Sequence, residues 1–76
     1  MNNTRDEKRL IEFGAQIRRL RKAKKLTMKG VAFDADIESS QVHRIEIGKI
    51  NPTLTTILLL ADGLEISPSR LSDYIR

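Results

Sequence analysis

The segment VAFDADIESSQVHRI, residues 31–45, holds two short apolar-patterned runs on either side of Asp34-Ala35-Asp36. Neither Gly nor Pro marks the bend that separates them. Two short helices joined by about three residues cannot lie antiparallel, so they must cross steeply. Such a turn usually needs a residue with positive φ, a conformation that Asp and Asn tolerate best after Gly. We therefore predict that Asp36 adopts the left-handed conformation and turns the chain.

Apolar periodicity and capping residues extend this pair into a series of helices. Thr4 and Glu7 have the form of a capping box, after which apolar residues recur at three- or four-residue steps as far as Ala23. Good N-cap residues precede three later helices, at Thr27, Thr53 and Ser67. The expected helices cover about residues 6–25, 28–35, 38–46, 54–63 and 68–75. No strand pattern is present, so the sequence predicts an all-α fold that forms one domain over residues 1–76.

The composition limits the possible functions. Aromatic residues make up 4% of the 76 residues, so aliphatic side chains must fill the core, including Leu54, Ile57, Leu58 and Ala61 of the fourth helix. The chain has no cysteine and one histidine, which excludes a thiolate site, and we expect neither a metal nor a cofactor. The longest apolar run, Ile57–Ala61, is too short to cross a bilayer, and the N-terminus lacks the apolar region of a signal peptide. We expect a soluble, cytoplasmic protein.

Positive charge is concentrated in one part of the chain. Fourteen Lys and Arg residues against ten Asp and Glu residues give a net charge of +4. Seven of these cations lie within residues 18–29, whereas residues 53–69 contain none. A basic concentration of this kind is typical of a protein that binds a polyanion such as nucleic acid. The alternative is a solvated helix face, and charge alone does not decide between the two.

The stretch IRRLRKAKKLTMKGVAFDADIESSQVHRIEIGKINPTLTTILLLADGLEIS, residues 17–67, resembles the phage-repressor/Cro-type, lambda-repressor-like helix-turn-helix family of DNA-binding transcriptional regulators. The resemblance covers about residues 13–71. It rests on Arg21, Leu26-Thr27, Val31-Ala32, Ala35, Ile37, Val42, Ile45-Glu46, Gly48-Lys49, Asn51-Pro52 and the helix from Leu54 to Leu64. The resemblance implies a compact five-helix domain whose second and third helices form the helix-turn-helix. It extends to short stand-alone regulators, including controller proteins of restriction–modification systems.

In this family the third helix lies in the major groove and presents side chains to base edges. The residues that this implies as base readers are Ser39, Ser40, Gln41 and Arg44. Gln41 and Arg44 are expected to carry most of the sequence information, because Gln pairs bidentately with adenine and Arg with guanine. The alternative is that they form only the solvent face opposite Val42 and Ile45.

Phosphate contacts are expected on both sides of this helix. The candidate residues are Thr27, Met28, Lys29, His43, Lys49 and Asn51. The first three lie at the N-terminus of the second helix, whose free N–H groups and positive dipole end attract a phosphate. Met28 stands where the family often has Gln, and Ile47 stands where it commonly has a polar residue. The resemblance also implies a structural ion pair between Arg21 and Glu46.

A homodimer on double-stranded DNA is expected, because two half-sites give more selectivity than one. The interface candidates are Leu59, Leu64, Ile66, Leu71, Tyr74 and Ile75, with Leu60 next to Leu59. The alternative is that these residues complete the core, and it is equally favoured for Leu60, Ile66 and Leu71. We expect no small-molecule ligand and no membrane partner.

Three rival functions follow from the same residues. An antitoxin-like or other protein-interaction module could use Phe33, Ile47 and Leu59, which stand at commonly polar positions of the family. Membrane-surface binding by the basic first helix is disfavoured, because its apolar residues are needed for the core. Catalysis by His43 with Ser39 or Ser40 would need an orienting carboxylate and an oxyanion hole, so we do not expect an enzyme.

Overall fold

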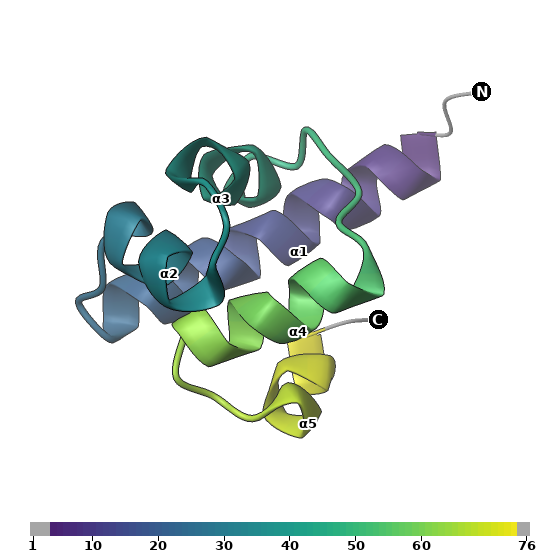
Figure 1. Ribbon diagram of the computed structural model, residues 1–76. Coiled ribbons are helices and arrows are strands. Elements are labelled where there is room, and N and C mark those ends of the chain that lie inside the picture. The colour runs from purple at the N-terminus through teal and green to yellow at the C-terminus, as the bar shows by residue number, and fades with distance from the viewer. Residues whose placement is uncertain (1–3, 75–76) are drawn as a thin grey trace.

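The computed structural model describes residues 4–74. Over these residues the chain forms α1 (Thr4–Ala23), α2 (Met28–Ala35), α3 (Ser39–Glu46), α4 (Leu54–Gly63), α5 (Pro68–Leu71) and a 3₁₀ helix η1 (Ser72–Tyr74), and it contains no strand. The all-α, five-helix fold is therefore confirmed. In Figure 1, α1 crosses the molecule behind α2 and α4, while α3 and α5 lie at opposite ends. α2 packs against both α3 and α4, and α1 packs against α3.

Helix boundaries differ from the expected ones mainly at the two ends of the chain. The first helix already includes Thr4, which was expected as its cap, and it ends at Ala23. The last segment is a four-residue α5 followed by η1, where one continuous helix was expected. Ile75 lies outside the described residues, and Tyr74 is described only through its backbone.

Four helices end in the same kind of left-handed turn. Lys25, Asp36, Gly48 and Glu65 have φ of 60°, 59°, 75° and 61°. The N–H of each of these residues donates to the carbonyl oxygen three residues earlier. The N–H of the next residue donates to the carbonyl oxygen five residues before itself, and the two bonds together form the Schellman motif. At the turn between α2 and α3, Asp36 N donates to Phe33 O at 3.2 Å and Ile37 N donates to Ala32 O at 3.0 Å. The predicted conformation of Asp36 is thus confirmed.

Aliphatic side chains from all five helices meet in one core. It consists of Ile17, Val31, Ala32, Val42, Ile45, Leu60, Ala61, Leu64 and Leu71. Leu64 and Leu71, proposed above for the dimer interface, are 0% and 1% exposed. The interface assignment is therefore wrong for both, and for Leu71 the alternative of a place in the core is confirmed. They are buried within one chain because the last turn of α4 and the end of α5 both pack on this core. Leu54 and Leu58, expected to face inward, are instead 72% and 42% exposed.

Two glycines let neighbouring helices approach closely. A Cβ on Gly14 of α1 would lie within 2.6 Å of the Glu46 carbonyl oxygen, and closer still to that of Ile45. A Cβ on Gly63 of α4 would lie 2.5 Å from the carbonyl oxygen of Val31 in α2. Backbone atoms cannot yield as flexible side chains do, so both positions must lack a side chain. These contacts fix the end of α3 on α1 and the second half of α2 on the end of α4.

Membrane-spanning helices and groups of metal-binding side chains are both absent from the described residues. None of the helices within residues 4–74 has both the length and the apolarity that a membrane-spanning segment needs. In the same residues, no three His, Asp or Glu side chains gather in a way that could hold a metal ion.

Candidate nucleic-acid interface

α3 is held with one face in the core and the other toward solvent. Val42, Ile45 and Glu46 are buried against the rest of the fold. Residues on the opposite side of the helix follow one another at steps of three and four, and all of them are exposed: Ser40, His43, Arg44 and Ile47. We call these four residues the outer strip. Buried side chains therefore back the outer strip along the length of α3.

The predicted base readers do not lie equally far out. Ser40 and Arg44 belong to the outer strip, whereas Ser39 and Gln41 are partly buried on its two flanks. Within the described residues, the side chains of Ser40, Gln41 and Arg44 form no hydrogen bond or ion pair. Their polar groups are therefore free to bind another molecule. His43, predicted as a phosphate contact, also lies on the outer strip.

Glu38 is a residue of this surface that the reading of the sequence missed. It is the N-cap of α3, with extended backbone at φ −79° and ψ 146°, and its side chain makes no capping hydrogen bond. The side chain is exposed at the end of α3 from which the outer strip begins. The available signal was the missing Ser, Thr or Asp in front of the third predicted helix, where the other short helices each have a capping hydroxyl.

The residues predicted to contact phosphates differ in what their side chains do. Thr27 caps α2, and its Oγ1 accepts a hydrogen bond from Gly30 N at 3.0 Å. The side chains of Lys29, Lys49 and Asn51 are exposed. Met28 packs its side chain against the core, which leaves only its backbone N–H for an anion. The site therefore offers cations on α2 and in the α3–α4 loop.

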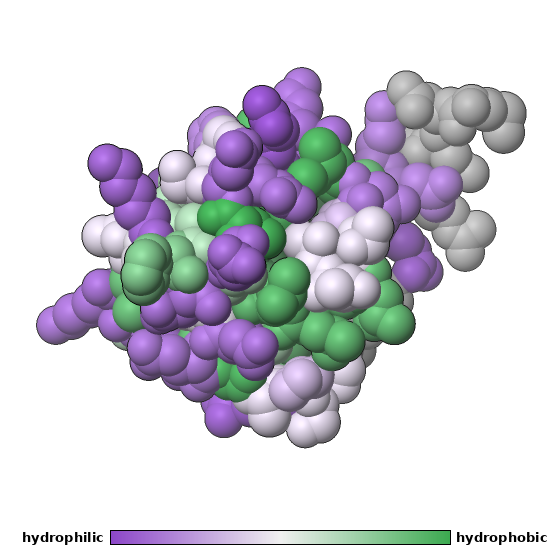
Figure 2. Space-filling model, in the orientation of Figure 1, coloured by the Kyte–Doolittle hydropathy of each residue, from purple (hydrophilic) through white to green (hydrophobic). Residues whose placement is uncertain are grey.

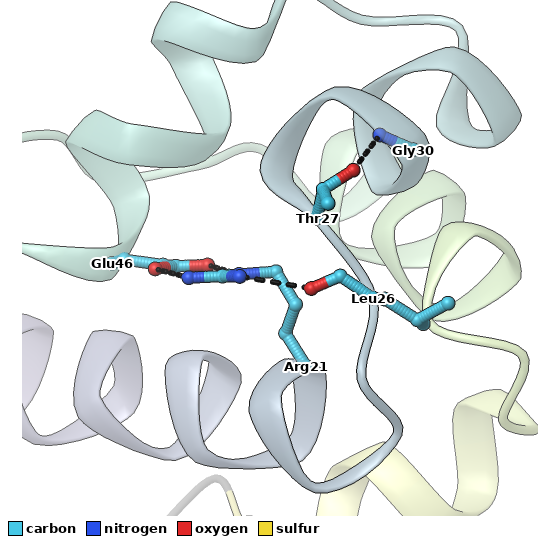
Figure 3. A network of polar contacts seen from close by, with 5 residues as sticks. All are labelled: Arg21, Leu26, Thr27, Gly30 and Glu46. Carbon is cyan, nitrogen blue, oxygen red and sulfur yellow. Dashed lines mark hydrogen bonds and ion pairs between the residues drawn. The ribbon is translucent and has the colours of Figure 1, made fainter.

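The ion pair of Arg21 and Glu46 ties the elements of this surface together. Nε and Nη2 of Arg21 donate to the two carboxylate oxygens of Glu46 at 2.6 and 3.0 Å, and Nη1 donates to the carbonyl oxygen of Leu26 at 2.9 Å. Figure 3 shows the guanidinium of Arg21 between these two partners, next to the Thr27 cap. One side chain of α1 thus holds both the end of α3 and the segment leading into α2.

Both charges of this pair are almost removed from solvent. Arg21 is 7% exposed and Glu46 is 6% exposed. The hydrogen bond to Glu46 raises the pKa of Arg21 above its ordinary value, although burial opposes part of the increase. Because the folded-state pKa is the higher one, the stabilisation is complete at neutral and mildly alkaline pH, and it is lost as the pH rises from the ordinary pKa of arginine to the folded-state value. The sequence resemblance implied this pair, and the structure contains it.

The face of the molecule drawn in Figure 2 has a polar part and an apolar part. Figure 2 shows hydrophilic residues around α3 and hydrophobic residues gathered over α4. Arg18, Arg19 and Lys22 line a shallow, open face of α1 together with Ala15 and Ala23. These three cations belong to the basic segment noted in the sequence, and they add positive potential to the half of the molecule formed by α1 and α2.

Two short helices that pack on each other, are joined by a turn at Asp36 and have the second helix backed by the core define a helix-turn-helix domain. The chain belongs to this family, because the family model described as a helix-turn-helix domain matches residues 12–74. The resemblance inferred from the sequence is thereby confirmed.

Two solved structures are similar over most of the chain. The crystal structure of the restriction-modification controller protein C.AhdI from Aeromonas hydrophila is 40% identical, with 82% of this chain and 94% of that chain covered and a TM-score of 0.77. An HTH_3 family transcriptional regulator from Vibrio cholerae is 28% identical, with 90% of this chain and 38% of that chain covered and a TM-score of 0.80. Among curated proteins, no sequence matches the chain significantly. The fold is thus that of helix-turn-helix transcriptional regulators.

Proposed function

We propose that the chain is a transcriptional regulator that binds double-stranded DNA as a homodimer, with α3 in the major groove of each half-site. The observation that carries the proposal is the outer strip of α3, whose polar side chains have no partner among the described residues and stand on a buried apolar face. Arg44 suits guanine, and the half-buried Gln41 suits adenine from the flank of the strip. The 40% identity to a controller protein supports a role of the controller type.

The size of the molecule supports two copies on one site. Its extents are 33 × 24 × 22 Å, and equivalent half-sites of a two-fold operator lie about 34–36 Å apart along the duplex. One protomer therefore covers about one half-site, and two protomers side by side reach both. We assign the contact between them to α4, where Leu54 and Leu58 are exposed one turn apart and Leu59 is partly buried.

Selection of binding sites from random duplexes at two salt concentrations tests this function. We expect enrichment of a two-fold symmetric motif, because two identical α3 helices read the two half-sites. The affinity should fall as the salt concentration rises, because phosphate contacts release counterions from DNA. Equal affinity for all duplexes, without an enriched motif, would contradict the proposal.

A second candidate function is protein binding by the same fold. Phe33 on α2 is 85% exposed, the largest value among the exposed large hydrophobic residues of the described chain. A single protruding aromatic ring of this kind is enriched at protein interfaces. Copurification of partners with the wild-type chain and with Phe33→Ala tests it. Loss of a defined partner together with unchanged DNA affinity would support a protein-binding role, and no loss would exclude Phe33 from one.

A further inference from the structure

The N-terminus of α3 carries a carboxylate that the fold does not use. Glu38 is exposed, makes no capping hydrogen bond, and forms no ion pair or hydrogen bond through its side chain within the described part of the chain. The N-caps of α2, α4 and α5 are Thr27, Thr53 and Ser67, each of which accepts a backbone N–H. A hydroxyl at position 38 would stabilise α3 in the same way. This helix therefore forgoes an interaction that the other three have.

We propose that Glu38 is a specificity-determining residue that selects a cytosine in each half-site. The inference rests on the proposed function, because it requires α3 to enter the major groove. The N-terminal side chains of a recognition helix are the ones that reach base edges. Glu38 stands at that end, where its side chain is exposed and makes no capping hydrogen bond.

The chemistry of the carboxylate restricts which base it can meet. An ionised carboxylate only accepts hydrogen bonds. Cytosine shows the N4 amino donor in the major groove, whereas guanine shows two acceptors and thymine shows one acceptor beside its methyl group. Adenine has the N6 donor, but its N7 acceptor lies beside it and repels a carboxylate. Cytosine is therefore the base that Glu38 fits.

The same charge acts against incorrect sequences. The DNA backbone repels a carboxylate. Where no base donates a hydrogen bond to it, Glu38 would lose its hydration without a compensating interaction, which weakens binding. Arg44, farther along α3, has no ion-pair partner among the described residues and cannot neutralise it within the protein. A carboxylate that served only the helix dipole would change stability and leave base preference unaltered. Base preference therefore separates the two roles.

Measured affinities for the selected site and for its single-base-pair variants test the inference. We expect the wild-type chain to prefer C·G at one position of each half-site by about tenfold or more. In Glu38→Gln that position should change to A·T, because an amide reads adenine. In Glu38→Ala the preference at that position should disappear, while affinity for random DNA rises. Glu12→Gln is the matched control, since Glu12 is exposed on α1 and undergoes the same loss of charge, and its motif should equal that of the wild type.

Two further outcomes complete the test. Identical base preferences for the wild type and Glu38→Gln would overturn the inference and leave the proposed function standing, whereas failure of the wild type to enrich any motif would overturn both. Glu38→Ser supplies a capping hydroxyl and should raise the Tm while losing the preference for cytosine. A raised Tm with the cytosine preference intact would contradict the role proposed for Glu38.

Discussion

The guanidinium of Arg21 joins three segments of the chain: α1, the end of α3 and the residues in front of α2. It contacts the carboxylate of Glu46 at the end of α3 and the carbonyl oxygen of Leu26 in front of α2, from its own place on α1. Both charged groups are buried, so removing one leaves the other desolvated and unpaired. Arg21 therefore serves the fold, although it lies in a sequence of exposed cations.

Replacing Arg21 by Ala should lower the free energy of unfolding by about 3–5 kcal/mol, the usual cost of breaking a buried ion pair. That is a large part of the total stability of a small domain, which is about 5–15 kcal/mol. Urea denaturation followed by circular dichroism measures the change. Lys22→Ala, a neighbouring exposed cation, is the control and should change the free energy by less than about 0.5 kcal/mol.

The double variant Arg21→Met/Glu46→Met should be less destabilised than the sum of the two single variants. It leaves no unpaired charge, and apolar replacements of buried pairs are often neutral. If Arg21→Ala instead weakened DNA binding without changing the free energy of unfolding, Arg21 would be a DNA contact and the structural role would be wrong.

The sequence was sufficient to predict the left-handed conformation of Asp36 but not that of two other residues. The three-residue turn demanded a positive φ, and Asp36 was the residue in the right place that tolerates it. Lys25 and Glu65 adopt the same conformation, with φ of 60° and 61°. Lys and Glu seldom do so, and no local pattern marked them, because the demand comes from the packing of the following Leu26 and Ile66 on the core.

The ends of three helices carry strain, because Lys25, Asp36 and Glu65 adopt positive φ there. The left-handed conformation costs a residue other than Gly about 1–2 kcal/mol. Gly avoids this cost, but part of the gain in stability is offset because Gly has more conformational freedom in the unfolded chain. We therefore expect Glu65→Gly to raise the free energy of unfolding by about 1 kcal/mol. The backbone oxygen of Glu65, which accepts a hydrogen bond from Lys24 Nζ at 2.9 Å, is retained in this variant.

Glu12→Gly provides the matched control for this change, because the side chain of Glu12 is exposed and the residue lies in the middle of α1, away from both helix ends. There Gly should lower the free energy of unfolding by about 1 kcal/mol. Chemical denaturation of the two variants tests the pair. A loss of stability in both would show that the α4–α5 turn does not strain Glu65.

The two glycines of α1 and α2 should respond to Ala in opposite directions. In Gly14→Ala the new Cβ meets backbone of α3, so we expect a loss of about 1–3 kcal/mol or more from overpacking. In Gly30→Ala the new Cβ meets only Thr27 Oγ1 at 3.2 Å, so the gain in helix propensity, up to about 1 kcal/mol, should remain. Thermal unfolding measures both. Equal losses in the two variants would contradict the proposed contact between α1 and α3.

The orientation of α4 was harder to predict than its existence. Six of its ten residues are aliphatic, so several helical faces look equally apolar and periodicity does not choose among them. The structure buries Leu60 and Ala61 and exposes Leu54 and Leu58, because the contact of Gly63 with α2 decides which side faces inward. α3 was easier, since polar and apolar residues alternate there with a clear helical period.

In the proposed complex the polar surface of α3 binds DNA and the apolar surface of α4 binds a second copy of the chain. Replacing both Leu54 and Leu58 by Lys should weaken the proposed homodimer by at least tenfold in Kd, because each exposed leucine is worth about 1.5 kcal/mol or more when fully buried. Stability of the isolated chain should change by only about 0.5 kcal/mol for each exposed site. Sedimentation velocity across a concentration series measures the Kd.

Phe33→Lys is the control for this experiment, since Phe33 is exposed on α2 and not on α4. It introduces a cation in place of an exposed apolar side chain, and it should leave the Kd unchanged. A Kd that is the same for the wild type and for the double α4 variant would remove α4 from the interface.

Methylation interference shows whether the outer strip of α3 lies in the major groove. Methylation of guanine N7 blocks the major-groove edge that Arg44 is expected to read. We predict that N7 methylation at one guanine of each selected half-site abolishes binding by the wild type, and that Arg44→Ala binds more weakly and no longer distinguishes methylated from unmodified DNA at that guanine. Interference confined to adenine N3 would place the protein in the minor groove, and guanine N7 interference that Arg44→Ala leaves unchanged would show that Arg44 does not read that guanine.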